Sequence, residues 1–539
     1  MSNSGGRLGW IRWAPAITGL IAVAGLVPSL PAAAAASSSA PVEVVVQAVP
    51  GAEPSAEASA VGLGGRIERR LNIIDGFIAR MPAGNVALLN SADGVRSASP
   101  DEPLHMVGQY GQGSGVASAV YTDVTRASKV WGSGDQGAGV NVAVIDTGVS
   151  TAGDLAGRVV HAEDFTTEQN NQDSYGHGTF VAGLIAGTGA ASAGAIMGEA
   201  PAAGIVSLKI AGADGTTDVT RVLEALEWVV TFKDVYHIRV VNLSFGTDGK
   251  QSYAIDPLDF AVERVWNDGI VVLVAAGNGG NLPGTISTPG DDPFVITVGA
   301  FNDRTTVSPS DDYVSTFSSS GPTVDGFAKP DVLADGRSVV SSRSVGSTVD
   351  LANPTSAIAP SYARGSGTSF STAIVSGAVA LILSATPSLR PNQVKYLLMS
   401  TARSLSGGST PATGSGEVDA FASTMSGAAS TPSANQGLAP AQGGGSLQAT
   451  RGSYCVRDQT GVCMSDQDAD ALLGFNESTY FSNNWAGSQW AGSQWAGSQW
   501  AGSGWQGSQW AGSQWAGSQW AGSQWAGSQW ATSQWMMVG

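Results

Sequence analysis

Runs of valine, isoleucine and leucine separated by helical stretches constrain the fold of this chain more than any other feature. Five short runs lack the polar–apolar alternation of a half-exposed strand, so we expect strands buried on both faces. They are Val140–Ile145, Gly204–Ile210, Val240–Ser244, Ile270–Ala275 and Phe294–Val298. Helical stretches alternate with them, including Val219–Lys233, Pro257–Asn267 and Ser369–Ala385. Strands and helices that alternate in this way form a parallel sheet covered by helices, so the sequence predicts an α/β fold.

Three polar residues stand at the ends of these elements, in the order Asp146, His177 and Ser369. Asp146 ends a buried strand, His177 lies between two glycines before an apolar helix, and Ser369 opens a long helix. A serine hydroxyl becomes a good nucleophile when an imidazole takes its proton and a carboxylate fixes the tautomer of that imidazole. Backbone N–H groups at a helix start favour a developing oxyanion. The pattern therefore predicts serine hydrolase chemistry.

Four strings around these residues resemble the motifs of the subtilisin-like serine proteases, the subtilases. They are Val144–Gly148, Gly176–Gly183, Ala275–Gly279 and Gly367–Ser369, and the resemblance covers about residues 120–425. It implies that Ser369 is the nucleophile, that His177 is the general base and then acid, and that Asp146 orients the imidazole. It also implies that the Asn278 amide donates to the oxyanion beside the backbone N–H of Ser369. Ala373 stands where the family usually has proline, which affects scaffold rather than chemistry.

The same resemblance implies where substrate binds. One segment would pair with an extended peptide as an added strand, and a second would frame an apolar pocket for the residue before the cut. The first consists of Leu243, Ser244, Phe245 and Gly246, and the second of Ala275, Ala276 and Gly277. Protein and peptide substrates are expected, while the width of the pocket and the cleavage preference stay open.

Each motif has a simpler interpretation when it is taken alone. Asp146-Thr147-Gly148 also suits an aspartic protease, but that class needs a second such loop, and this sequence has none. Gly-Thr-Ser before a helix is often only an N-cap, and an asparagine between glycines is often a turn residue. The occurrence of all motifs in order favours a secreted endopeptidase. The alternative is a surface protein that binds glycan or cell wall and carries an inactive protease fold.

Two segments precede the catalytic region. Residues 1–36 have the basic leader, the short apolar stretch Ile17–Val27 and the small residues Ala32–Ala36 of a secretory signal peptide. Residues 37–106 show a β-α-β-α-β order that resembles the inhibitory propeptide of subtilases, a small ferredoxin-like α+β domain, with an independent binding domain as the alternative. A precursor that cuts itself within residues 103–120 would follow. Residues 107–425 would then form a subtilisin-like three-layer domain with a mostly parallel central sheet.

Composition predicts three further segments after the catalytic region. Residues 426–446, rich in Gly, Ser, Ala, Thr and Pro, are expected to be a flexible linker. Residues 447–484 hold Cys455 and Cys463, which suit a small disulfide loop in an exported chain, with free thiols as the alternative. In residues 485–539 a tryptophan recurs every five residues from Trp485 to Trp535, eleven times, mostly as Trp-Ala-Gly-Ser-Gln. This repeat tail suits contact with cell wall or glycan, or is a neutral expansion.

Charge and metal-ligand patterns limit the partners. The net charge of −17 argues against nucleic-acid binding and is ordinary for a secreted protein. No cofactor is required for the chemistry, and no metal ligands are assigned. Calcium is common among subtilases, but Asp154 is the sole match to a family ligand, and we expect it to be a surface carboxylate. The chain is therefore expected to be secreted, with retention at the cell surface left open.

Overall fold

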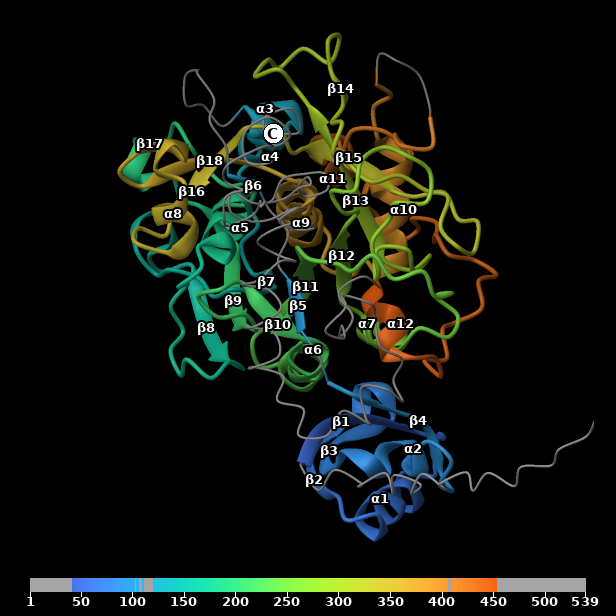
Figure 1. Cartoon of the computed structure of the whole chain (residues 1–539). Helices are drawn as coiled ribbons and strands as arrows, with labels where there is room; N and C mark the ends of the chain where they lie inside the picture. The colour runs from blue at the N-terminus through green and yellow to red at the C-terminus, as the bar shows by residue number, and fades with distance from the viewer. Residues whose placement is uncertain (1–40, 102, 106–108, 111–119, 406–409, 453–539) are drawn as a thin grey trace, which may run out of the picture. The chain divides into compact units, whose positions relative to one another are not determined.

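The computed structural model describes residues 41–101, 103–105, 109–110, 120–405 and 410–452 (Figure 1). The predicted signal peptide, both cysteines and the repeat tail lie outside the described residues. The predictions about them therefore stay predictions.

The N-terminal module, residues 41–100, is a four-stranded antiparallel sheet with two helices. Its elements are β1 (Pro41–Ala48), α1 (Glu53–Gly62), β2 (Arg66–Leu71), β3 (Gly76–Pro82), α2 (Val86–Leu89) and β4 (Val95–Pro100), in the sheet order β2-β3-β1-β4. The sequence predicts one bent stretch over residues 69–81, but the structure has two strands there. Asp75 adopts a left-handed conformation at φ 51°, so the chain reverses and Leu71 pairs with Gly76. This extra strand completes the ferredoxin-like α+β fold.

The central sheet is almost entirely parallel. The five predicted strands are β7 (Asn141–Asp146), β9 (Gly204–Lys209), β11 (Ile238–Leu243), β12 (Val271–Ala275) and β13 (Ile296–Asn302). They are joined by β8 (Val159–Asp164), β14 (Tyr313–Val314) and β15 (Val332–Asp335). The order is β14-β13-β12-β11-β7-β9-β8, with β15 also paired to β13, and β14 alone runs antiparallel to its neighbour. The predicted α/β class and the buried strands are confirmed.

Two pairs of helices cover this sheet, as Figure 1 shows. The helices α5 (His177–Ala186) and α9 (Thr368–Ala385) pack on each other, and so do α6 (Val219–Phe232) and α7 (Pro257–Asn267). Among the described helices α9 is long and apolar enough to cross a membrane, but 89% of it is buried inside the fold, so it is a core helix. It runs unbroken through Ala373, which is fully buried.

Shorter elements surround this core. The helices are α3 (Tyr121–Val124), α4 (Ala127–Trp131), α8 (Thr348–Ala352), α10 (Pro391–Thr401), α11 (Ala420–Ser426) and α12 (Leu447–Arg451). A second sheet contains β16 (Val339–Ser342), β18 (Tyr362–Ser366), β17 (Ala357–Ala359) and β6 (Gln109–Tyr110). A separate strand pair joins β5 (Pro103–His105) to β10 (Thr216–Asp218).

The segment after α11 differs from its predicted flexible state. The Ala441 N–H donates to the Glu263 carboxylate at 2.9 Å, and the Tyr253 hydroxyl donates to the Ala439 carbonyl at 2.8 Å. The Gly445 N–H donates to the Ile255 carbonyl at 2.6 Å. Glycine and alanine let this backbone lie directly on the catalytic region. In this segment the glycine- and alanine-rich composition therefore allows close packing.

The carboxyl group of Glu263 carries a prediction about stability. Burial, and then the nearby Asp292, raise the pKa of Glu263 to about 9. The folded chain thus holds a proton that the unfolded chain releases near pH 4.5, so stability falls as pH rises from that value towards 9. In a Ser369→Ala background, which prevents self-digestion, Glu263→Gln should make the fall in Tm between pH 5 and pH 9 at least about 3 °C smaller. Thermal unfolding followed by circular dichroism measures this, and an unchanged fall in Tm would contradict it.

Candidate active site

The carboxylate of Asp146 and the imidazole of His177 form a buried pair. Asp146 is the last residue of β7, and His177 is the first residue of α5. The Nδ1 atom of His177 lies 2.8 and 3.0 Å from the two carboxylate oxygens of Asp146, and both side chains are 0% exposed. Because a carboxylate can only accept, Nδ1 donates the proton, and Nε2 of the neutral ring is the basic nitrogen.

A glycine beside the histidine allows this approach. A Cβ atom at Gly178 would collide with the Gly148 carbonyl oxygen and would lie 3.2 Å from Cβ of Asp146. A side chain there would push the first turn of α5 away from the end of β7. The glycine after His177 in the Gly-His-Gly string is therefore required for the close approach of Asp146 and His177.

The Ser369 side chain lies in the first turn of α9. Its hydroxyl donates to the Ser244 carbonyl at 3.0 Å, and the Ser244 hydroxyl donates to the Ser369 carbonyl at 3.0 Å. These reciprocal bonds join the start of α9 to the residue that follows β11. The Phe370 ring packs 5.6 Å, between centroids, from the His177 ring. The Nε2 atom of His177 is buried and has no hydrogen-bond partner among the described residues.

The side-chain amide of Asn278 is held in one orientation by Thr368. The Asn278 Oδ1 atom accepts from the backbone N–H and from the hydroxyl of Thr368, each at 3.0 Å. The Thr368 hydroxyl itself accepts from the Gly277 N–H at 3.2 Å. Because Oδ1 is engaged, Nδ2 is the atom of the Asn278 amide that remains available to donate. This atom is buried and has no acceptor among the described residues. Sequence reasoning did not give Thr368 this role, although it stands within the Gly-Thr-Ser string.

The predicted substrate-binding residues follow two neighbouring strands of the central sheet. Leu243 ends β11, and Ser244, Phe245 and Gly246 follow it. Ala275 ends β12, and Ala276 and Gly277 lead to Asn278. All seven of these residues are buried. Both segments continue the carboxyl ends of neighbouring strands, so the sheet brings them to the edge where Asp146 also lies.

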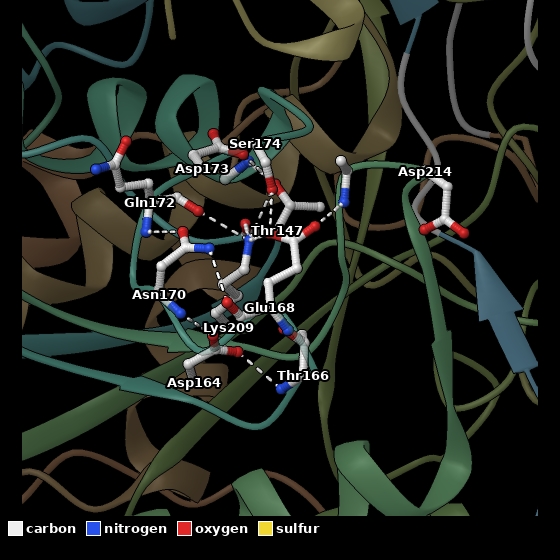
Figure 2. Close-up of polar contacts among 12 residues, drawn as sticks. Thr147, Asp164, Thr166, Glu168, Asn170, Gln172, Asp173, Ser174, Lys209 and Asp214 are labelled. Carbon is white, nitrogen blue, oxygen red and sulfur yellow. Dashed lines mark hydrogen bonds and ion pairs between the residues drawn. The ribbon is translucent and has the colours of Figure 1, made fainter.

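A buried lysine supports the backbone next to Asp146, as Figure 2 shows. The Lys209 ammonium donates to the Thr147 carbonyl at 2.9 Å, to the Gln172 carbonyl at 2.8 Å and to the Ser174 hydroxyl at 3.1 Å. It also lies 3.3 Å from the Glu168 carboxylate. A fully buried ammonium requires such partners, so these contacts fix the loop that precedes His177. The sequence signal for this role was a charged residue at the end of an apolar strand.

A second carboxylate, that of Asp173, holds the start of α5. It accepts from the Gly176 N–H at 2.6 Å, from the Thr179 N–H at 2.7 Å and from the Thr147 hydroxyl at 2.7 Å. Burial raises the pKa of Asp173, and these hydrogen bonds oppose the shift. Thr147 thus connects the strand that carries Asp146 to the helix that carries His177. The sequence analysis did not identify Asp173.

The described residues offer no metal site in this structure. No group of three or more His, Cys, Asp or Glu side chains among them is placed to hold a metal ion. The prediction that Asp154 is a surface carboxylate is wrong. Asp154 is 3% exposed, accepts from the Ala191 N–H at 2.7 Å and accepts from the Tyr362 hydroxyl at 2.5 Å. Its carboxylate therefore joins two loops of the fold.

Together, the parallel sheet and the Asp–His pair next to a helix-start serine define the architecture of a subtilisin-like serine hydrolase. The profile of the subtilase family matches residues 137–444. The chain is 40% identical to the serine protease AprX of Bacillus subtilis over 285 residues, which are 51% of this chain and 64% of that protein. It is 35% identical to subtilisin Savinase of Lederbergia lenta over 288 residues, 53% of this chain and 91% of that protein. The subtilisin-like protease SBT6.1 of Arabidopsis thaliana is 30% identical over 314 residues, 55% of this chain and 27% of that protein.

The chain therefore belongs to the subtilase family. Its fold and its family are those of serine-type endopeptidases.

Proposed function

We propose that the protein is a secreted serine endopeptidase that acts through an acyl-enzyme on Ser369. One observation carries this proposal. The site presents one buried acceptor, Nε2 of His177, and one buried donor, Nδ2 of Asn278, and neither has a partner among the described residues. A buried acceptor or donor without a hydrogen-bond partner lowers stability. Two such atoms in one site are therefore typical of a site in which the reacting substrate supplies the missing partners.

The reaction uses these atoms in turn. The Ser369 hydroxyl turns from the Ser244 carbonyl towards Nε2 of His177, gives up its proton, and attacks the carbonyl carbon of the scissile bond. Asp146 stabilises the imidazolium that forms. The oxyanion accepts from the Asn278 amide and from the backbone N–H of Ser369, where the start of α9 adds positive potential. His177 then protonates the leaving amine, and water releases the acyl group by the same route.

Two short strands support self-processing of a precursor. His105 in β5 pairs with Thr216 of β10, and Gln109 in β6 pairs with Ser366 of β18, three residues before Ser369. Pairings on both sides of residues 106–108 thus hold the chain, as they would hold an extended substrate paired with two strands. We propose that the module and β5 form the inhibitory propeptide, and that the cut lies between His105 and Gln109. The apolar residues Met106 and Val107 stand in this interval.

Self-processing predicts a defined product. Expressed alone, the Ser369→Ala chain should keep its precursor mass after signal removal, because no hydroxyl attacks the junction. The unaltered chain should yield a mature protein that begins at Val107 or Gly108, if the cut follows an apolar residue. Intact-mass and N-terminal sequence analysis measure both. Maturation of the Ser369→Ala chain at the same bond, in a host that lacks other proteases, would contradict self-processing.

We also propose that the repeat tail locates the enzyme rather than taking part in catalysis. It contains no candidate acid, base or nucleophile of the triad, and its many tryptophans suit weak multivalent contact with cell wall or glycan. Because Thr450 and Arg451 are fully buried, a truncation must end after Gly452 to leave the fold intact.

The truncated chain should hydrolyse peptides within about threefold of the full chain, yet lose retention on insoluble cell wall because the multivalent contacts are gone. A pull-down of both chains on purified wall measures this. Equal retention of the two chains would remove the targeting role and leave the tail a neutral expansion.

A further inference from the structure

The C-terminal arm, defined as residues 439–451, is firmly attached to the catalytic domain. The Gln442 N–H donates to the Ala254 carbonyl at 2.9 Å, and the Thr450 hydroxyl donates to the Asp256 carboxylate at 2.8 Å. The Ser446 N–H donates to the Gln251 side chain at 2.9 Å. These bonds are independent of the N-terminal module, so the arm should stay with the enzyme when the module leaves.

The same arm also contacts the N-terminal module. The Gln442 carbonyl accepts from the Gln47 amide at 3.4 Å and from the Arg96 guanidinium. A Cβ atom at Gly443 would lie 2.6 Å from Nε2 of Gln47. At Gly444 it would lie 3.0 Å from Cδ of Arg96. The arm therefore lies directly against β1 and β4, and a side chain at either position would force the Gln47 or Arg96 side chain to move.

The strongest contact is made by Arg451, which is 0% exposed. Its guanidinium donates to the Pro100 carbonyl at 2.8 Å and lies 4.0 Å from the Asp101 carboxylate. Asp101 also accepts from the Thr220 N–H at 2.9 Å, at the start of α6. Pro100 ends β4, just before the strand β5 that pairs with β10. A buried guanidinium requires polar partners, and here the module supplies them.

We propose that the C-terminal arm is part of the surface that binds the propeptide, and that Arg451 delays release of the propeptide after the cut. The inference rests on the proposed function. Gln47, Arg96, Pro100 and Asp101 all precede the proposed junction, so cutting between His105 and Gln109 leaves their contacts with the arm in place. Release must break these contacts and leave the Arg451 guanidinium without the Pro100 carbonyl. The C-terminal arm therefore sets the delay before activity appears.

The test follows the full chain after self-cleavage. Size-exclusion chromatography at successive times gives the half-time for dissociation of the cut fragment, and a fluorogenic peptide gives the lag before activity. Arg451→Met should shorten both about ten- to a hundredfold, since it removes one partner of a buried charged hydrogen bond. Arg96→Ala should shorten both about two- to fivefold. Arg96 is only partly buried, so this variant keeps the test valid if Arg451→Met does not fold.

The matched control is Arg239→Met. Arg239 also donates to two backbone carbonyls, those of Pro387 and Leu389, each at 2.9 Å, and it has no such bond to the module. In the Arg239→Met chain the cut fragment should dissociate with the same half-time as in the unaltered chain. Unaltered half-times in folded Arg451→Met and Arg96→Ala chains would overturn the role of the arm. Absence of self-cleavage and activity in the unaltered chain would instead count against the proposed function, so the two failures are distinguishable.

Discussion

Ser369→Ala should lower peptide turnover on the order of 10⁶-fold, because it removes the one oxygen that becomes acylated. The substitution deletes a single atom from the first turn of α9, so the fold should persist. The main structural loss is the hydrogen bond to the Ser244 carbonyl. Turnover is measured with a fluorogenic peptide. Because the Ser369→Ala chain should not process itself, both chains are first cut at the junction by an added protease, which is then removed.

The control for this variant is Ser376→Ala on the same helix. Ser376 is also fully buried, and its hydroxyl donates to the Asn242 side chain at 3.0 Å. That substitution should lower stability but leave turnover within about threefold, because the hydroxyl lies two helical turns from Ser369. Turnover of Ser369→Ala within tenfold of the unaltered chain would end the assignment of the nucleophile.

Asn278→Ala should lower kcat about a hundred- to a thousandfold and change KM little, since the lost donor acts on the transition state. The geometry explains why this amide is suited to the role. Thr368 engages Oδ1 of Asn278 twice, so Nδ2 is presented to the site without reorganisation. Steady-state kinetics at several substrate concentrations separate kcat from KM.

Asn302→Ala is the matched control, because within the described residues the Asn302 amide donates to an exposed neighbour, the Tyr313 hydroxyl, at 2.9 Å and accepts from the nearby Arg304 N–H at 2.8 Å. Its kinetics should be unaltered. If Asn278→Ala lowered kcat less than about threefold, the oxyanion would have to be stabilised by other groups.

The sequence predicted the elements whose patterns are local. The continuous apolar runs gave the buried parallel strands, and α7 has the predicted bounds, Pro257–Asn267. Asp146, His177, Ser369 and Asn278 could be proposed as one site because each closes or opens such an element, and the family motifs fix their order. In the structure Asp146 is hydrogen-bonded to His177, and the Ser369 hydroxyl is bonded to the Ser244 carbonyl. The catalytic roles of these residues stay predictions.

The contacts between distant parts of the chain were not predictable from local patterns. Thr368 orients Asn278 across ninety residues of sequence, and Lys209 supports Thr147 across sixty-two. The short strand β10 has no apolar run, because its pairing partner is β5 rather than a core strand. The composition of residues 426–446 predicted a flexible linker where the structure has close packing, because glycine is common in both kinds of segment.

Labelling with a fluorophosphonate tests whether His177 activates the Ser369 hydroxyl. The activated oxygen attacks phosphorus and fluoride leaves, so the processed full chain should gain one adduct, located on Ser369 by peptide mapping. The Ser369→Ala and His177→Ala chains, cut at the junction by an added protease because they should not process themselves, should gain none over the same period. An unlabelled Ser369 in a chain that digests casein, or full labelling without His177, would contradict the account.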